Sequence, residues 1–253
     1  MADKNDEFRP GKLGRAKLRQ DSNATATMTH RHENKLRGLL VLPGWNDDGE
    51  RQFEDLKQKL TPSGWILHQS SLPDASWSPA DRATVNRDQA LHQAIDDYMA
   101  LCGVRGVSRS RMALLGFSFG AYMASFLASS KPARLLVLRS PALYPDEGWD
   151  VAKEELDKTE LRRYRSSMRS PRENRSLRCC ADFTGDVLLI DSAEDQIIPP
   201  QVIHSYERSF GKARSVTRHT IADADHQLPR PAWRQEYQNV VIEWLNARFE
   251  QEP

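Results

Sequence analysis

The stretch Arg111–Ser130, with the sequence RMALLGFSFGAYMASFLASS, decides the fold of this chain. Its apolar run Met112–Leu115 predicts a buried strand, and residues 121–129 predict a helix rich in small side chains. Between them, the glycines of Gly116-Phe117-Ser118-Phe119-Gly120 stand two positions to either side of a serine. A strand that reverses directly into a helix leaves no room for side chains at those two flanking positions. The stretch therefore predicts a strand, a sharp turn with Ser118 at its apex, and a helix.

Apolar runs that predict further strands lie on both sides of this stretch, and segments with helical periodicity separate them. The predicted strands are Arg37–Leu42, Trp65–Ser70, Ala133–Leu138, Asp186–Ile190, Ser215–Thr220 and a weak edge strand at Thr25–Arg31. The predicted helices are Glu50–Leu60, Arg82–Leu101, Gln201–Phe210, Ala232–Phe249 and one near Val151–Tyr164. Such alternation predicts an α/β fold with a mostly parallel central sheet and helices on both faces. Ligands of such sheets bind beyond the carboxyl ends of the strands.

The helix predicted over residues 82–101 has an apolar stripe that we expect to face the core. Its members are Val85, Gln89 or Leu91, His92, Ile95, Tyr98 and Met99. Because His92 lies on or beside this stripe, we interpret it as a packed structural histidine.

The length fits one large α/β domain or two small ones, and the composition has no strong charge bias. The chain has 253 residues, with 36 Lys and Arg against 35 Asp and Glu. This balance argues against nucleic acid or an anionic membrane as the main partner. No apolar run approaches the roughly 18 residues that span a bilayer, and the first 20 residues lack the apolar core of a secretory signal.

The domain prediction has three parts. Residues 1–22 are polar and basic, and predict a flexible arm, with a solvated tail favoured over a nucleic-acid-binding arm. Residues 23–253 are predicted to form a single domain. Within it, residues 144–183 are heavily charged and poor in large apolar side chains, which predicts a short cap insertion.

The three cysteines indicate a reducing compartment. Cys179 and Cys180 are adjacent and Cys102 stands alone, so they form neither a disulfide framework nor a C-x-x-C metal motif. We therefore expect a cytoplasmic protein with no metal and no cofactor, whose partner is a small molecule. The sequence does not indicate the oligomeric state.

The G-x-S-x-G pattern around Ser118 is typical of a nucleophile presented at a strand-to-helix turn. A serine hydroxyl needs a base to take its proton, and the base needs an acid to orient it. His226 lies in the loop after the last predicted strand and downstream of the serine, whereas His204 and His219 fall inside a helix and a strand. His226 is therefore the candidate base.

The candidate acids stand in the loop after the strand Asp186–Ile190. Asp191 lies at the strand end and is the weaker candidate, and chemistry alone leaves Glu194 open. We favour Asp195, because the pattern Asp-x-x-Ile-Pro places it at the turn, where a short side chain reaches the imidazole. For the oxyanion, the backbone N–H groups of Phe119 and of Trp45, in the loop after Arg37–Leu42, are the candidates.

The order Ser118, Asp195, His226 and the flanking motifs resemble the α/β-hydrolase family. Within it, the Asp-x-x-Ile-Pro and Ala-Asp-His segments are most similar to the dienelactone-hydrolase-like and small serine carboxylesterase branch. The resemblance covers about residues 25–250 and implies a serine hydrolase fold with a catalytic triad. Two features depart from it: dienelactone hydrolase has a cysteine where this chain has Ser118, and Pro43-Gly44 stands where lipases carry His-Gly.

The predicted function is hydrolysis of a carboxylic ester or thioester of a small to medium substrate through an acyl-enzyme. The alternatives are acyl transfer or peptide cleavage by the same residues, and a non-catalytic binding or scaffold protein that retains the fold. Asp74 and Trp77, in a strand-end loop, are candidate substrate-binding residues, with an ordinary surface loop as the alternative.

The arginines of the cap segment favour an anionic substrate, but its acidic residues could equally neutralise them across helical spacings, and a solvated charged lid is the preferred interpretation. The arginines are Arg162, Arg163, Arg165, Arg169, Arg172, Arg175 and Arg178, and the acids are Glu154, Glu155, Asp157 and Glu160.

Overall fold

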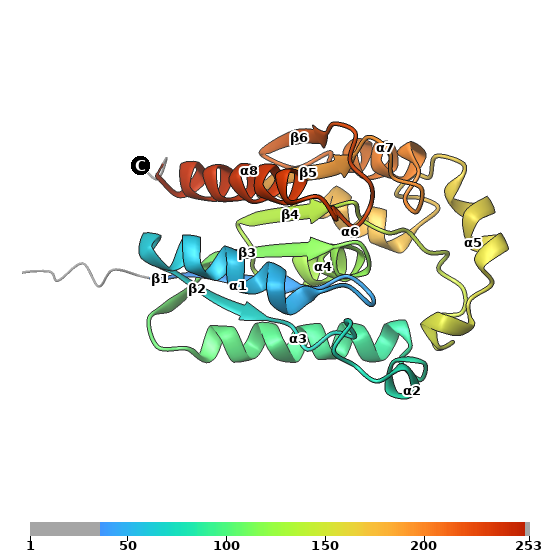
Figure 1. The fold of residues 1–253 in the computed structure, drawn as a ribbon, viewed down its shortest axis with the longest axis horizontal. Helices are drawn as coiled ribbons and strands as arrows, with labels where there is room; N and C mark the ends of the chain where they lie inside the picture. The colour runs from blue at the N-terminus through green and yellow to red at the C-terminus, as the bar shows by residue number, and fades with distance from the viewer. Residues whose placement is uncertain (1–35, 251–253) are drawn as a thin grey trace, which may run out of the picture. The chain divides into compact units, whose positions relative to one another are not determined.

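The computed structural model describes residues 36–250 (Figure 1). The arm predicted over residues 1–22 and the edge strand predicted at Thr25–Arg31 lie outside the described residues. None of the helices in residues 36–250 is long and apolar enough to cross a membrane.

Six parallel strands form one sheet in the order β2-β1-β3-β4-β5-β6. The strands are β1 (Leu36–Leu42), β2 (Trp65–Gln69), β3 (Val107–Phe117), β4 (Leu135–Arg139), β5 (Asp186–Ser192) and β6 (Ser215–Ile221). Each lies within two residues of its predicted bounds apart from the start of β3, so the predicted α/β fold is confirmed. The strand order reverses at β1, which pairs with both β2 and β3, and in sheets of this kind the ligand-binding crevice lies beyond the strand ends at such a reversal.

Helices cover both faces of the sheet (Figure 1). One face packs against α1 (Gly49–Leu60) and α8 (Pro231–Glu250), and the other packs against α3 (Arg87–Gly103), α4 (Phe119–Ser130), α6 (Arg175–Asp182) and α7 (Pro200–Ser209). Along β1, Leu39 and Val41 point to the first face, and Leu40 and Leu42 to the second. Strands buried on both faces read as continuous apolar runs, which is why the sequence reveals them so clearly.

The helix predicted over Arg82–Leu101 is wrong at its start. A separate short helix, α2 (Pro79–Arg82), comes first, and α3 begins only after Asn86. The Asn86 side chain accepts a hydrogen bond from the Gln89 N–H, and the Gln89 side chain accepts one from the Asn86 N–H. This reciprocal capping box fixes the start of α3 at Asn86. The helix predicted from the apolar pattern therefore begins too early.

The predicted core stripe of α3 is also displaced. Ala90 and Ala94 are fully buried, because their small side chains let the helix approach the sheet closely. Of the predicted stripe, Tyr98 is buried, and Val85, Leu91 and Ile95 are half-buried and packed against the core, whereas Met99 is 44% exposed. The side chain of His92 is 71% exposed, so its interpretation as a packed structural histidine is wrong.

The charged segment 144–183 has two environments. Its first part carries the short helix η2 (Lys153–Glu155) and α5 (Lys158–Arg165), and α5 lies beyond the carboxyl ends of the strands (Figure 1). Asp157 caps α5 by accepting from two N–H groups, which divides the helix predicted near Val151–Tyr164 into η2 and α5. The second part, α6, packs on α4 through buried side chains such as Leu177.

Candidate active site

Ser118 occupies a strained turn between β3 and α4. Its backbone has φ of +47° and ψ of −106°, which residues other than glycine rarely adopt. The Ser118 N–H donates to the carbonyl of Arg139 at 2.9 Å, and the Ala142 N–H donates to the Ser118 carbonyl at 3.0 Å. These two bonds hold the turn against the end of β4 and leave the serine half-buried at the rim of the sheet.

The two glycines of the turn are required by close backbone approaches. A Cβ at Gly116 would lie 2.4 Å from the Cα of Ala121, inside the following helix. A Cβ at Gly120 would lie 2.2 Å from the carbonyl oxygen of Leu42 and 2.4 Å from that of Pro43. The start of α4 therefore lies directly against the loop that follows β1.

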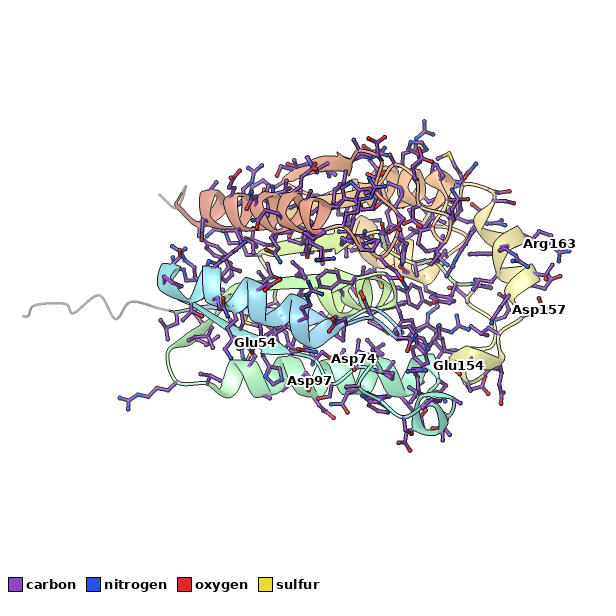
Figure 2. All side chains as sticks on the ribbon, viewed as in Figure 1. Glu54, Asp74, Asp97, Glu154, Asp157 and Arg163 are labelled. Carbon is purple, nitrogen blue, oxygen red and sulfur yellow. The ribbon has the colours of Figure 1, made fainter. Side chains whose placement is uncertain are left out.

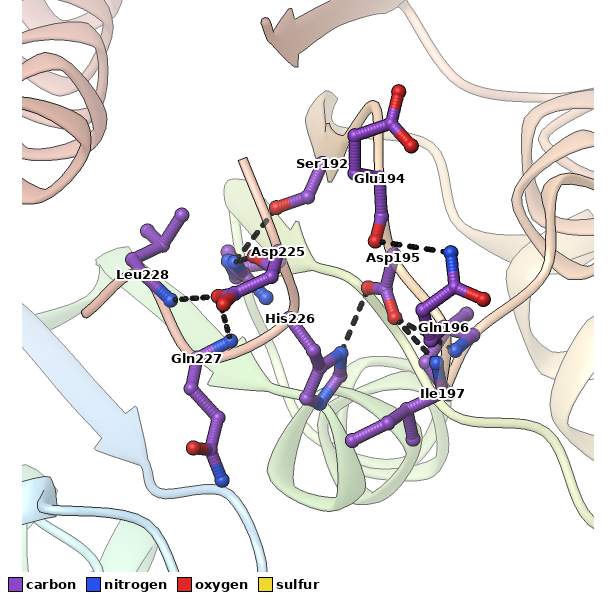
Figure 3. Close-up of polar contacts among 11 residues, drawn as sticks. Ser192, Glu194, Asp195, Gln196, Ile197, Asp225, His226, Gln227 and Leu228 are labelled. Atoms are coloured by element: carbon purple, nitrogen blue, oxygen red, sulfur yellow. Dashed lines mark hydrogen bonds and ion pairs between the residues drawn. The ribbon is translucent and has the colours of Figure 1, made fainter. Parts of the chain in front are cut away.

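The candidate base and acid form a hydrogen-bonded pair (Figure 3). Nδ1 of His226 donates to Oδ2 of Asp195 at 2.7 Å, and the two side chains are 13% and 4% exposed. Burial raises the pKa of Asp195. The hydrogen bond and charge of His226 and the N–H groups of Ile198 and Ile197 outweigh burial, and the pKa lies below its ordinary value. An ionised carboxylate only accepts, so Nδ1 of His226 is the donor in this hydrogen bond.

Two turns of the same kind position this pair. Oδ1 of Asp195 accepts from the N–H groups of Ile197 and Ile198 at 2.9 and 2.8 Å. Asp225, the residue directly before His226, makes the same kind of turn: its Oδ1 accepts from the N–H groups of Gln227 and Leu228, both at 3.0 Å (Figure 3). Each aspartate thus folds its own loop.

The acid loop and the base loop are also joined to each other. The backbone N–H of Glu194 donates to the carbonyl of Ala224 at 2.9 Å. Glu194 contributes this backbone bond, and its exposed side chain does not contact His226 within residues 36–250. Asp191 accepts instead from Arg218 and Thr220 on β6. Of the three acids considered, Asp195 is the one that faces the histidine.

A small pocket brings Ser118 and His226 together. We call it the nucleophile pocket; it has a volume of about 20 Å³, enough for about one water molecule. It is lined by Asp47, Phe117, Ser118, Arg139, His226, Gln227 and Leu228. A pocket of this volume does not enclose a whole small-molecule ligand.

Arg139 is a residue of this pocket that the sequence reasoning missed. Its side chain is 3% exposed, and its Nη2 donates to Ser192 Oγ at 2.9 Å and to the Asp225 carbonyl at 3.3 Å. Burial lowers the pKa of Arg139, and negative charges led by Asp195 oppose that shift. The guanidinium thus ties the end of β4 to the acid loop and the base loop. The feature of the sequence that could have revealed this residue is an arginine directly at the end of a buried strand.

The side chains of the two candidate oxyanion residues are in contact. The ring of Trp45 meets that of Phe119 edge to face, with centroids 5.0 Å apart. Within residues 36–250, neither backbone N–H is used in a hydrogen bond, so both remain available to a ligand. The N–H of Phe119 also belongs to the first turn of α4, where the helix dipole favours negative charge.

Asp74 and Trp77 lie apart from the nucleophile pocket. Asp74 is 5% exposed, and its carboxylate accepts from Ser76 in its own loop and from Gln69 at the end of β2. The carbonyls of Asp74 and Trp77 both accept from Arg82. These contacts are those of a folded loop, and a direct role in substrate binding stays a prediction.

In residues 36–250, no group of three or more His, Cys, Asp or Glu side chains is placed to hold a metal ion.

The fold and this arrangement define the class: the chain has the α/β-hydrolase fold. No family model and no curated protein matches the sequence. Among solved structures, one of the metagenome-derived lipolytic enzymes LipS and LipT is similar, with 12% identity, a TM-score of 0.64, and coverage of 85% of this chain and 95% of that one.

Two further solved structures have the same fold. Est1E from Butyrivibrio proteoclasticus with bound ferulic acid has 14% identity and a TM-score of 0.63, covering 86% of this chain and 91% of that one. A putative dienelactone hydrolase from Klebsiella pneumoniae subsp. pneumoniae MGH 78578 has 16% identity and a TM-score of 0.62, covering 87% and 88%.

Proposed function

We propose that this protein is a serine hydrolase that cleaves a carboxylic ester or thioester through an acyl-enzyme. The observation that carries the proposal is the buried 2.7 Å bond between His226 and Asp195, in a pocket shared with Ser118 at the strained turn. A packed core needs none of these three features. The lipolytic and esterase names of proteins with the same fold support ester hydrolysis as the reaction class.

In the proposed mechanism, Nε2 of His226 takes the proton of the Ser118 hydroxyl as its oxygen attacks the substrate carbonyl. Asp195 holds the imidazole in the required tautomer and stabilises the imidazolium that forms. The N–H groups of Phe119 and Trp45 donate to the oxyanion of the tetrahedral intermediate. His226 then protonates the leaving group, and the bond from the carbonyl carbon to that group breaks.

Deacylation repeats the sequence with water as the nucleophile. His226 takes a proton from water, the hydroxyl attacks the acyl carbon, and Ser118 leaves with the proton returned by His226. Use of another acceptor in place of water would make the protein an acyltransferase, so product analysis distinguishes the two activities.

The test is covalent labelling with a fluorophosphonate together with hydrolysis of short-chain p-nitrophenyl esters. We expect labelling of the folded protein at Ser118, and loss of both labelling and hydrolysis in Ser118→Ala. Ser130→Ala is the matched control, because it removes a serine hydroxyl from the far end of the same helix. A folded protein that is neither labelled nor active would support the binding or scaffold alternative.

A further inference from the structure

A second and larger cavity lies beside the nucleophile pocket. We call it the cationic pocket; its volume of about 330 Å³ is in the range of small-molecule sites. It is lined by Trp45, Asn46, Arg82, Lys153, Glu154, Leu156, Lys158 and Leu161. Its wall therefore carries three cationic side chains and one carboxylate. Glu154, at its edge, is labelled in Figure 2.

The two pockets share one loop. Trp45 and Asn46 line the cationic pocket, and Asp47, the next residue, lines the nucleophile pocket. The Trp45 ring contacts Phe119, which directly follows Ser118. A substrate whose carbonyl sits at Ser118 therefore reaches the cationic pocket by passing along the Trp45 side chain.

The single carboxylate of the cationic pocket is already committed. Glu154 Oε1 accepts from Trp45 Nε1 and from Arg82 Nε, both at 3.1 Å. Lys153 and Lys158 have no carboxylate within ion-pair distance in the described part of the chain. The pocket thus keeps an excess of positive charge that its own residues do not neutralise.

Lys153 is the best-placed cation for a ligand. Its Nζ lies 4.4 Å from the centroid of the Trp45 ring, within the range of a cation–π contact. Burial lowers the pKa of Lys153 to about 8, the positive charges of Arg165, Lys158 and Arg82 add to the shift, and Glu154 opposes it. An anion beside the ammonium would relieve this unfavourable environment.

We propose that the cationic pocket binds a carboxylate at the far end of the substrate, so that the preferred substrates are esters that also carry a free carboxylate. This inference rests on the proposed function, because the carboxylate is selected relative to the carbonyl that Ser118 attacks. The pocket supplies specificity, and the residues around Ser118 supply the chemistry.

The test compares monomethyl and dimethyl esters of succinate, glutarate and adipate, which differ at one end, where the monoester has a charged carboxylate and the diester a neutral methyl ester. We expect kcat/KM for the preferred monoester to exceed that for its diester by tenfold or more. Raising the salt concentration should reduce this ratio, since salt screens the attraction. The chain length with the largest ratio reports the span from Ser118 to Lys153.

Lys153→Met keeps an apolar stem on Trp45 but removes the charge, so we expect it to abolish the monoester preference. In the wild type, the monoester preference should decline as the pH rises through about 8, because Lys153 then loses its charge. Lys153→Arg should preserve the preference and should not show this decline. The matched control is Lys57→Met, which removes another ammonium from an aromatic ring, that of Phe53 at 5.5 Å on α1. It should leave the ratio unchanged.

The inference is overturned if the wild type cleaves diesters as well as monoesters, or if Lys153→Met retains the preference. Either result can occur with full fluorophosphonate labelling at Ser118, in which case the proposed function stands and the carboxylate site fails. Loss of labelling and of all ester hydrolysis in the wild type instead removes the proposed function itself.

Discussion

Replacing Asp195 with asparagine tests the acid–base pair most directly. The asparagine Oδ1 can keep the two bonds from Ile197 and Ile198 that fold the loop. Its NH₂ group then faces Nδ1 of His226 in place of the Oδ2 that now accepts at 2.7 Å. Two donors cannot pair, so the imidazole must adopt the other tautomer and carry its proton on Nε2. In that form it cannot accept the proton of Ser118.

The expected loss in kcat is about 10⁴-fold, the size found where such a tautomer is reversed in a serine triad. This corresponds to about 5 kcal/mol of transition-state stabilisation. The assay is steady-state hydrolysis of a p-nitrophenyl ester at neutral pH. Thermal unfolding of the same samples should show a change that is small beside the catalytic loss, because the loop bonds remain.

Glu194→Gln is the matched control for this substitution. It makes the same chemical change one residue away, on an exposed side chain that does not contact His226 in the described residues. We expect it to retain nearly full activity. If Asp195→Asn keeps more than a tenth of the wild-type kcat, or if Glu194→Gln shows the larger loss, then Asp195 is not the group that orients the base.

Three further substitutions have defined outcomes. Gly120→Ala should cost at least about 2 kcal/mol of stability and lower the unfolding midpoint by several degrees, because its Cβ would meet the Leu42 carbonyl at 2.2 Å; an unchanged midpoint would contradict the close approach. Arg139→Met should lower kcat by about 10²-fold with little change in KM, because the bond to the Asp225 carbonyl that positions the base loop is lost; a change in KM alone would argue for substrate binding instead. Asp186→Asn should destabilise the protein at neutral pH, and urea unfolding should show the difference disappearing at low pH. Its pKa is lowered in the fold because hydrogen bonds and charge outweigh burial, so its stabilisation is present above the ordinary value of 3.8 and is lost as the pH falls through the lowered value.

The parallel sheet was predictable because its central strands, β1, β3, β4 and β5, are buried on both faces over most or all of their length. Runs such as Leu39–Leu42 are apolar at every position, which is typical of a strand buried on both faces. The glycines on either side of Ser118 are typical of a sharp turn from a strand into a helix. The start of α3 was not predictable from apolar periodicity, because a side-chain capping bond at Asn86 determines it. The exposure of His92 was missed for a related reason: the core side of α3 is occupied by small alanines, which contribute little to an apolar stripe.

The candidate site was accessible to sequence reasoning where chain order carries the information. The loops of Asp195 and His226 follow successive strands, and parallel strands bring such loops to one edge. The placement of Arg139 depends on hydrogen bonds from the end of β4 to the end of β5 and to the loop of His226, which no local pattern encodes. The cationic pocket likewise depends on tertiary contact, since Lys153 and Trp45 are far apart in the chain.

The position of β4 in the sheet has a mechanical consequence. Ser118 follows β3, Asp195 follows β5 and His226 follows β6, so β4 and β5 lie between the strands that carry the candidate nucleophile and the candidate base. Neighbouring strands are rotated by about 20–25° relative to one another, and the alignment of Ser118 and His226 therefore depends on the twist accumulated across β4 and β5. Substitutions in the buried centre of β4, remote from any substrate, can misalign the reaction as effectively as changes at the site itself.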